Sequence, residues 1–210
     1  MTEKITPPAA ADATAARRRK RPRKVTADYL ENAALYYLER FATSAANLRR
    51  VLLRKVELSA REHGTDRDDG AALVEALVAR YQAAGLLDDA AYAAGRARSL
   101  HRQGGSTRAI RARLAAKGVA AAVVEEAVED LSAETDGNPD VAAAIAFARR
   151  RGFGPFRRPA LGLRAAAADP AERRLKELAA MARAGFSFDI AARVIDAPDR
   201  DALDDLLAGG

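Results

Sequence analysis

The chain alternates short amphipathic stretches with polar or glycine-containing breaks, and its apolar residues have helical spacing. In the segment 106–131, Ile110 and Leu114 lie four residues apart behind Ser106, a favourable helix N-cap. Gly118 then follows as a helix-ending residue. A second apolar stripe after this glycine predicts another short helix. No stretch of the chain alternates apolar and polar residues as a half-buried strand does, so the pattern predicts an all-α fold.

The same pattern recurs on both sides of this segment. A shift of 62 positions places Ser106 on Ser44, and a shift of 67 positions in the other direction places Gly118 on Gly185. Two independent matches around one segment predict three copies of a degenerate repeat, each with three short helices. Units of this size are too small to be stable alone, so we expect tandem three-helix repeats stacked in an elongated, curved array. A chance similarity among Ala- and Arg-rich helices is the alternative.

The breaks between the apolar stripes divide the chain into four parts. The polar stretch Glu62–Gly70 predicts a loop, and the Gly- and Pro-containing segment 152–169 predicts an irregular connector. We expect helices at 27–41, 44–60, 71–85, 88–102, 106–117, 119–131, 140–151, 170–184, 188–195 and 199–207. We expect a disordered basic tail at 1–24 and repeats at 25–86, 87–134 and 135–210.

Composition narrows the class of protein. Alanine supplies much of the apolar content and aromatic residues only 5%, which suits closely packed helices with modest cores. Cysteine is absent, which excludes disulfides, thiolate nucleophiles and Cys-ligated metals. No apolar run is long enough for a membrane span, and the basic N-terminus lacks the apolar core of a signal peptide. We therefore expect a cytoplasmic monomer.

Positive charge is unevenly distributed. Residues 1–24 hold eight Lys/Arg and two acidic residues, which accounts for the whole net charge of +6. This tail is either an arm for phosphates or merely solubilising. The body is neutral, yet the intervals 39–57, 89–125 and 140–169 contain no acidic residue between their ends and five, seven and six basic residues. We predict one basic face along the row, which suits a polyanion or an acidic partner. The alternative is that Arg-rich codon composition produces these windows.

Basic residues within these windows are the candidate partner- or DNA-binding residues. Arginine dominates them, which suits bidentate contacts to phosphate or carboxylate. Aromatic residues are sparse on the predicted basic faces, so stacking of bases is not indicated. The candidates are Arg49, Arg50, Arg54, Lys55, Arg96, Arg98, Arg102, Arg108, Arg111, Arg113, Lys117, Arg149, Arg150 and Arg151.

The sequence contains no recognisable catalytic motif. The two histidines, His63 and His101, are too far apart in sequence for a recognised ligand pair, and no nucleophile elbow, Walker A loop or HExxH motif is present. The run Gly104–Thr107 before a helix offers backbone N–H groups to a phosphate, or is a helix C-cap followed by an N-cap. Pairs of adjacent acidic residues are typical of helix caps and solvated helix faces and do not have the spacing of EF-hand calcium ligands. We expect no enzyme activity, metal or cofactor.

The central run also resembles a known family. The motifs GLLDDAAYA, RQGGSTRAI and LAAKGV within residues 71–128 are similar to the most recognisable pattern of the RecX family of recombinase regulators. LERFATSAANLRRVLLRKV resembles the first repeat of that family, and GFGPF with MARAGFSFDIAARVI resembles the third, so the resemblance covers about residues 26–196. A longer charged loop after the first repeat and the basic tail depart from the family pattern.

The resemblance implies a protein of three tandem three-helix repeats that binds RecA. Family members lodge in the groove of the RecA–DNA filament, inhibit strand exchange and ATP hydrolysis in DNA repair and recombination, and in some cases bind DNA directly. A free-standing DNA-binding protein remains a rival, because the turn at Gly104–Gly105 between two helices resembles a helix-turn-helix. Against it, the helix 106–117 offers mostly Arg and Ala rather than base-reading Asn or Gln. A helical enzyme subunit is the third possibility.

Overall fold

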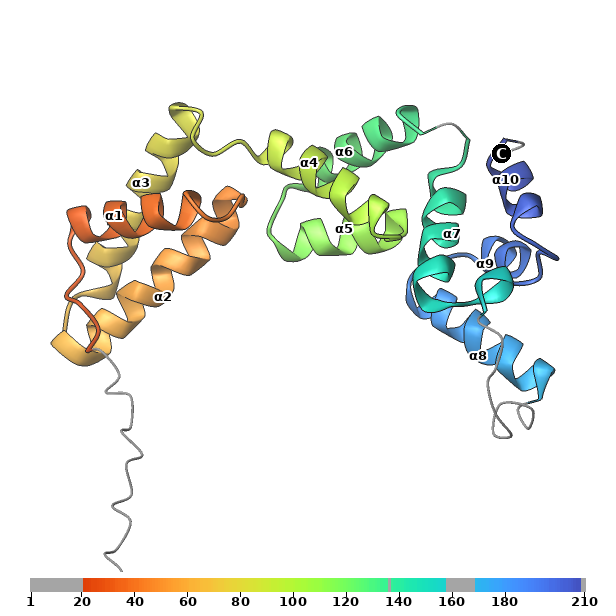
Figure 1. The fold of residues 1–210 in the computed structure, drawn as a ribbon. Coiled ribbons are helices and arrows are strands. Elements are labelled where there is room, and N and C mark those ends of the chain that lie inside the picture. The colour runs from red at the N-terminus through yellow and green to blue at the C-terminus, as the bar shows by residue number, and fades with distance from the viewer. Residues whose placement is uncertain (1–20, 136, 158–168, 209–210) are drawn as a thin grey trace, which may run out of the picture.

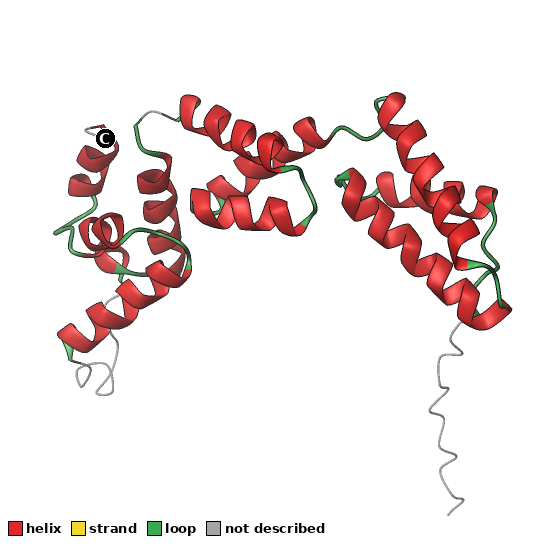
Figure 2. Cartoon of the chain, turned by 180° about the vertical axis from the view of Figure 1, so that it is seen from behind, coloured by secondary structure: helices red, strands yellow, loops and turns green. Residues whose placement is uncertain are grey.

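The computed structural model describes residues 21–135, 137–157 and 169–208, and all regular secondary structure in this part of the chain is helical. No strand occurs among these residues, which confirms the predicted all-α class (Figure 2). None of their helices is long and apolar enough to cross a bilayer. The elements are α1 (Ala27–Leu38), α2 (Ala45–His63), α3 (Arg67–Ala83), α4 (Asp89–Arg102), α5 (Thr107–Ala116), α6 (Ala121–Ala133), α7 (Pro139–Arg151), a 3₁₀ turn η1 (Gly154–Phe156), α8 (Pro170–Arg183), α9 (Phe188–Ile195) and α10 (Asp201–Ala208).

The helices form three units in a bent row (Figure 1). Each unit buries an apolar cluster of its own: around Leu48 and Leu52 in α1–α3, around Ile110 and Leu114 in α4–α6, and around Met181 in α7–α10. In both views the units form an arch with α4–α6 at its centre and α5 on its concave side (Figures 1 and 2). The apolar stripes that predicted the helices are therefore the cores of three separate small units.

Most predicted helix ends agree with the structure, but the loop predicted at Glu62–Gly70 is wrong. Helix α2 continues to His63, and α3 begins at Arg67, so only three residues connect them. Gly64 ends α2 with a φ of 62°, and the carboxylate of Asp66 accepts hydrogen bonds from two backbone N–H groups at the start of α3. The polar composition of this stretch belongs to helix caps and solvated turns, because capping residues and loop residues are the same types.

Gly70 lies inside α3 rather than at its start. A Cβ atom built on Gly70 would lie 2.5 Å from Cγ1 of Val56. The absence of a side chain therefore lets α3 pack closely on α2 within the first unit.

The connector after α7 is fixed by a buried carboxylate. Glu177 of α8 is only 6% exposed and accepts a hydrogen bond from the backbone N–H of Gly154 at 3.2 Å. Arg157 pairs with the same carboxylate through its Nε and Nη2 atoms at 2.8 and 2.6 Å. The hydrogen bonds with Glu177 raise the pKa of Arg157 above its usual value. The remaining part of the predicted irregular connector, 158–168, lies outside the described residues.

Residues 21–25 lie against the first unit. The Oγ of Ser59 accepts a hydrogen bond from the N–H of Val25 at 2.9 Å, and the Nε2 of His63 lies 2.8 Å from the carbonyl oxygen of Pro22. The end of the predicted tail is thus attached to α2, whereas residues 1–20 lie outside the described part of the chain.

The first and second units meet through a buried serine at the start of α2. The Oγ of Ser44 accepts a hydrogen bond from the N–H of Asn47, which caps α2, and donates to the carbonyl oxygen of Lys117 at 2.5 Å. Asp89 of α4 accepts a hydrogen bond from the N–H of Ala45 at 2.7 Å. The N-terminus of α2 is thereby joined to the C-terminal end of α5 and to the start of α4.

The second and third units meet in the same way. The Oγ of Ser106 accepts from the N–H of Ala109 and donates to the carbonyl oxygen of Ala184 at 2.8 Å. Asp140 of α7 accepts hydrogen bonds from the N–H and the hydroxyl of Thr107 at 2.7 and 3.0 Å. Both serines are fully buried, and each satisfies polar groups of two units at once.

A glycine makes the close approach possible at each junction. Gly118 has a φ of 76°, and a Cβ atom at this position would lie 2.5 Å from the Cβ of Ala46. Gly185 has a φ of 94°, and its Cβ atom would lie 2.5 Å from the Oγ of Ser106. A side chain would be strained in this left-handed conformation and would push the units apart. Glycine is therefore required for contact as well as for ending the helix.

Replacing Ser106 by alanine should destabilise the protein by about 2 kcal/mol, because the change removes an N-cap and leaves a buried carbonyl without a donor. Ser187→Ala is the matched control: Ser187 caps α9 through the N–H of Ile190 at 3.3 Å but is itself exposed. The control should cost about 1 kcal/mol or less. Urea unfolding followed by circular dichroism measures both. Equal losses would show that the bond between units contributes nothing.

Candidate partner-binding surface

The structure divides the predicted basic residues into those that are paired and those that are not. Three of them form ion pairs with carboxylates from other helices of their own unit. Hydrogen bonds from Arg98 lower the pKa of the Glu134 carboxyl, and the same bonds raise the pKa of Arg98. The acidic partners lie outside the acid-free windows or at their boundary, so segregation along the sequence is not segregation in space. The pairs are Arg49–Glu75 at 2.7 Å, Arg98–Glu134 at 2.5 Å and Arg111–Glu125 at 2.9 Å.

A second group is held by aromatic rings or by uncharged oxygens. Such contacts position a cation without neutralising it, so these residues stay positive at the surface. Arg50 donates to the carbonyl oxygen of Ala116 at 3.3 Å, and Arg150 to the carbonyl oxygen of Gln103. The remaining contacts place Lys55 over Tyr29, Arg149 over Phe156, Arg150 and Arg151 over Phe147, and Lys117 beside the side-chain oxygen of Asn47.

A third group makes no hydrogen bond or ion pair with any other described residue. All of its members are exposed, and four of the five belong to α4 and α5 of the central unit. These side chains can bind a partner at little cost, because no existing ion pair or hydrogen bond has to be broken. They are Arg54, Arg96, Arg102, Arg108 and Arg113.

An arginine-lined crevice follows the junction of the second and third units. It has a volume of about 440 Å³ and is lined by Arg108 and Arg113 of α5 and by Arg183 of α8. An adjoining hollow contains Arg150 of α7 together with Arg113 and Arg183. No acidic side chain lines either space. Arg183 is not among the predicted residues, because Glu177 and Asp189 flank it in the chain and exclude it from the basic windows.

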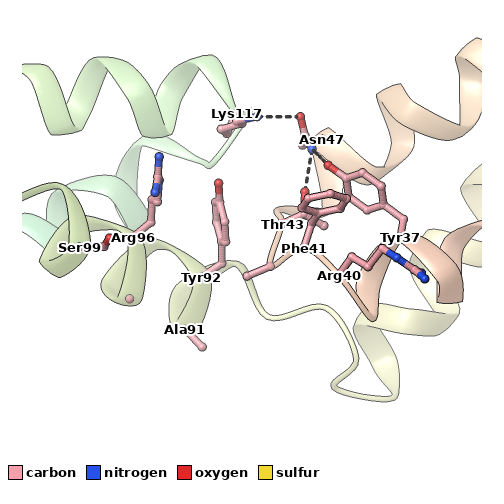
Figure 3. A pocket seen from close by; sticks show the side chains of 12 residues that line it. Tyr37, Arg40, Phe41, Thr43, Asn47, Ala91, Tyr92, Arg96, Ser99 and Lys117 are labelled. Atoms are coloured by element: carbon pink, nitrogen blue, oxygen red, sulfur yellow. Dashed lines mark hydrogen bonds between the residues drawn. The ribbon is translucent and has the colours of Figure 1, made fainter.

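Another cleft lies at the junction of the first and second units (Figure 3). It has a volume of about 470 Å³, and three aromatic residues, Tyr37, Phe41 and Tyr92, contribute to its walls. The predicted basic residues Arg96 and Lys117 lie beside these rings (Figure 3). The sequence predicted that aromatic side chains are sparse near the basic residues, and this prediction is wrong at the first junction. Folding brings the three rings together from two units.

His101 and the run Gly104–Thr107 have structural partners. His101 lies with its Nε2 atom 2.7 Å from the carbonyl oxygen of Pro139, which joins the second and third units. The N-terminal N–H groups after Gly105 are occupied by Ser106 and Asp140, so this run is the predicted pair of caps rather than a phosphate cradle. Among the described residues, no group of three or more His, Cys, Asp or Glu side chains is placed to hold a metal ion.

Comparison with known proteins identifies the family. A family model described as the second three-helix domain of RecX matches residues 88–128, which include α4, α5 and most of α6. The regulatory protein RecX of Myxococcus xanthus strain DK1622 is 49% identical over 177 residues, which cover 84% of this chain and 89% of the relative. The chain belongs to the RecX family. The regulatory protein RecX of Agrobacterium fabrum strain C58 is 38% identical over 181 residues, which cover 84% of this chain and 86% of the relative.

Solved structures of RecX proteins share the fold. The crystal structure of RecX from Lactobacillus salivarius matches with a TM-score of 0.52 at 18% identity, over 86% of this chain and 96% of that one. A second crystal structure of a regulatory protein RecX matches with a TM-score of 0.55 at 19% identity, over 81% of this chain and 71% of that one. The all-helical fold of this chain is therefore shared with solved RecX proteins.

Changing Arg102, Arg108 and Arg113 together to glutamate should leave the thermal unfolding of this RecX chain nearly unchanged. These three side chains form no ion pair with another described residue, and exposed charges contribute only about 0–1 kcal/mol each to folding. Thermal unfolding followed by circular dichroism is the measurement. A loss of cooperative unfolding would show that the arginines support the central unit.

Proposed function

We propose that this RecX chain binds the RecA recombinase in the groove of the RecA–DNA filament and inhibits strand exchange and ATP hydrolysis. Membership of the RecX family supports the proposal, because the sequence resemblance to that family implies a RecA partner. The observation that carries it further is the exposed set of unpaired arginines on α4 and α5, at the centre of the arch. The protein would act in the cytoplasm, as a regulator without catalysis or a cofactor, during DNA repair and recombination.

We further propose that the three units are copies of one repeat. The junctions support this, since Ser44 and Ser106 make equivalent bonds 62 positions apart and Gly118 and Gly185 make equivalent approaches 67 positions apart. A row of equivalent units suits a partner that is itself a helical polymer, because each unit meets a similar environment on the filament. A monomer that spans several RecA subunits gains affinity from linked contacts.

Electrostatics would guide the docking. Unpaired arginines attract acidic protein surfaces and DNA phosphates over several ångströms and set the orientation of the complex. Their planar guanidinium groups then form bidentate bonds with carboxylate or phosphate. The arginines already paired with Glu75, Glu125 and Glu134 have lower capacity for a partner, because binding would first have to break a bond within the unit.

The rival helix-turn-helix function meets a physical obstacle. A recognition helix contacts base edges with residues near its N-terminus. The N-terminus of α5 is instead covered by the third unit, where Ser106 bonds to Ala184 and Thr107 bonds to Asp140. Inserting α5 into a major groove would require the second junction to open. Direct DNA binding by the exposed arginines, without base recognition, remains compatible with this geometry.

The test is RecA-dependent ATP hydrolysis on single-stranded DNA, with increasing amounts of the chain. Wild-type protein should inhibit hydrolysis, and the triple variant of Arg102, Arg108 and Arg113 to glutamate should require at least ~10-fold more protein, because like charges at an interface cost several kcal/mol. The control for net charge changes Arg61, Arg80 and Arg193 to glutamate, which alters the charge equally outside the basic windows. Because these three arginines pair with Glu57, Glu31 and Asp189, circular dichroism must first show that the control variant is folded.

The control variant should inhibit RecA at concentrations similar to those of the wild-type chain. If the two triple variants lose inhibition equally, net charge rather than the central unit carries the effect. If the wild-type chain leaves hydrolysis unchanged, RecA is not its partner.

A further inference from the structure

The cleft between the first and second units combines features that the remainder of the basic surface lacks. It lies between the end of α1 with its following loop and the side of α4, and Lys117 at the end of α5 borders it. Twelve residues line the cleft, and none of them is Asp or Glu. A volume of about 470 Å³ lies within the range of sites for small ligands.

Three rings face this space from two units. Tyr37 and Phe41 form a tilted pair with ring centroids 5.1 Å apart, and Tyr92 lies across the cleft on α4 (Figure 3). Phe41 is 55% exposed, because α1 ends at Leu38 and the ring projects from the following loop rather than from the helix predicted at 27–41. An exposed aromatic ring beside two others gives a flat ligand a surface to stack on.

A hydrogen-bond network holds one side of the cleft in place. The side-chain nitrogen of Asn47 donates to the hydroxyl of Tyr37 at 3.1 Å and to that of Thr43 at 2.7 Å. The ammonium group of Lys117 lies 3.5 Å from the side-chain oxygen of the same asparagine (Figure 3). Because Asn47 and Thr43 are buried, one ring and one cation are positioned before any ligand arrives.

Cations border the rings on both sides. Arg96 is exposed and makes no ion pair or hydrogen bond with another described residue, and Lys117 is also exposed. On the opposite side Arg40 stacks 3.6 Å from the centre of the Tyr36 ring, while its Nη1 atom lies 3.2 Å from a carboxylate oxygen of Glu39. The cleft therefore offers flat apolar surface in its middle and, beside α4 and the end of α5, positive charge without an acidic partner, whereas Arg40 on the other edge is paired with Glu39.

The equivalent place at the second junction is also basic. A shift of 62 positions maps the cleft residues Phe41–Thr43 onto Gln103–Gly105. The junction residues Asp89 and Asp140 are 51 positions apart, and the same shift maps Ser99 onto Arg150. The second hollow has arginines but only one buried ring, that of Phe147. A strand that followed the row would meet a stacking surface at the first junction and cations for its phosphates at the second.

We propose that the cleft binds a nucleotide of a single-stranded nucleic acid, with its base against Phe41 and Tyr92 and its phosphates on Arg96 and Lys117. A base presents the flat ring, and the phosphodiester next to it presents the negative charge, at the spacing of one nucleotide. Bases of a duplex are already stacked and paired, so the cleft favours single strands. This site requires no RecA and therefore goes beyond the proposed function.

Fluorescence of an oligothymidylate that carries one 2-aminopurine tests stacking directly, because stacking on an aromatic ring changes its emission. Wild-type protein without RecA should change the emission, and Phe41→Ala or Tyr92→Ala should weaken binding by ~10-fold, since one stacked base contributes about 1–3 kcal/mol. Tyr92→Phe should bind like the wild-type chain. The matched control is Phe188→Ala, because Phe188 is a 71% exposed ring on α9, outside the cleft.

Salt dependence separates the charge contribution from stacking. Arg96→Ala should reduce the slope of log affinity against log salt by about 0.7, the value for one phosphate contact on a single strand. Tyr92→Ala should leave that slope unchanged. Oligouridylate as the probe compares RNA with DNA. Binding of either supports the site, because the stacking and phosphate contacts are common to both.

Three results would overturn the proposal: no binding by the wild-type chain, equal binding by Tyr92→Ala and wild type, or displacement of the probe by duplex DNA as readily as by single strands. Displacement by an acidic, tyrosine-containing peptide in preference to single strands would assign the cleft to a protein partner instead. Circular dichroism confirms that each variant is folded. RecA inhibition measured on the same variants separates the two ideas, since either activity can persist without the other.

Discussion

A buried serine hydroxyl that bonds to two helical units at once is the interaction on which the arrangement of this RecX chain depends. Ser44 and Ser106 each cap the helix that they precede and donate to a carbonyl oxygen at the end of a helix in the next unit. Asp89 and Asp140 add a second bond at each junction. The three units have separate and small apolar cores, so these bonds, with the close approach at Gly118 and Gly185, determine how the units sit relative to one another.

The arrangement matters because the binding groups are spread over the row. Of the free arginines of the central unit, Arg96 lines the aromatic cleft at the first junction, and Arg108 and Arg113 line the arginine crevice at the second. A partner that contacts all of them gains most when the units are already in position, because less freedom is lost on binding. Ion pairs such as Arg98–Glu134 stabilise single units locally and leave the unpaired arginines to the partner. Apolar packing therefore stabilises each unit, the junction bonds position the units relative to one another, and the unpaired arginines stay available to a partner.

Local signals predicted most of the fold. Ser44, Ser106 and Gly118 mark helix ends through backbone geometry that depends on neighbouring residues alone, and the apolar stripes mark the cores. The stretch Glu62–Gly70 was predicted wrongly, because Gly70 serves a helix crossing and not a turn. Nothing in the sequence indicated that Arg98 meets Glu134, 36 residues away, or that Tyr92 faces Phe41. Such contacts depend on how whole units pack, and the binding surface consists mainly of such contacts.

The most direct measurement is an electron cryomicroscopy reconstruction of the chain bound to its RecA filament on single-stranded DNA, assembled with a non-hydrolysable ATP analogue. The account predicts all three units in the filament groove, with the arch close to the shape that it has alone. Arg102, Arg108 and Arg113 should lie within hydrogen-bond distance of RecA carboxylates or DNA phosphates. A chain attached through a single unit, or with these arginines directed to solvent, would contradict it.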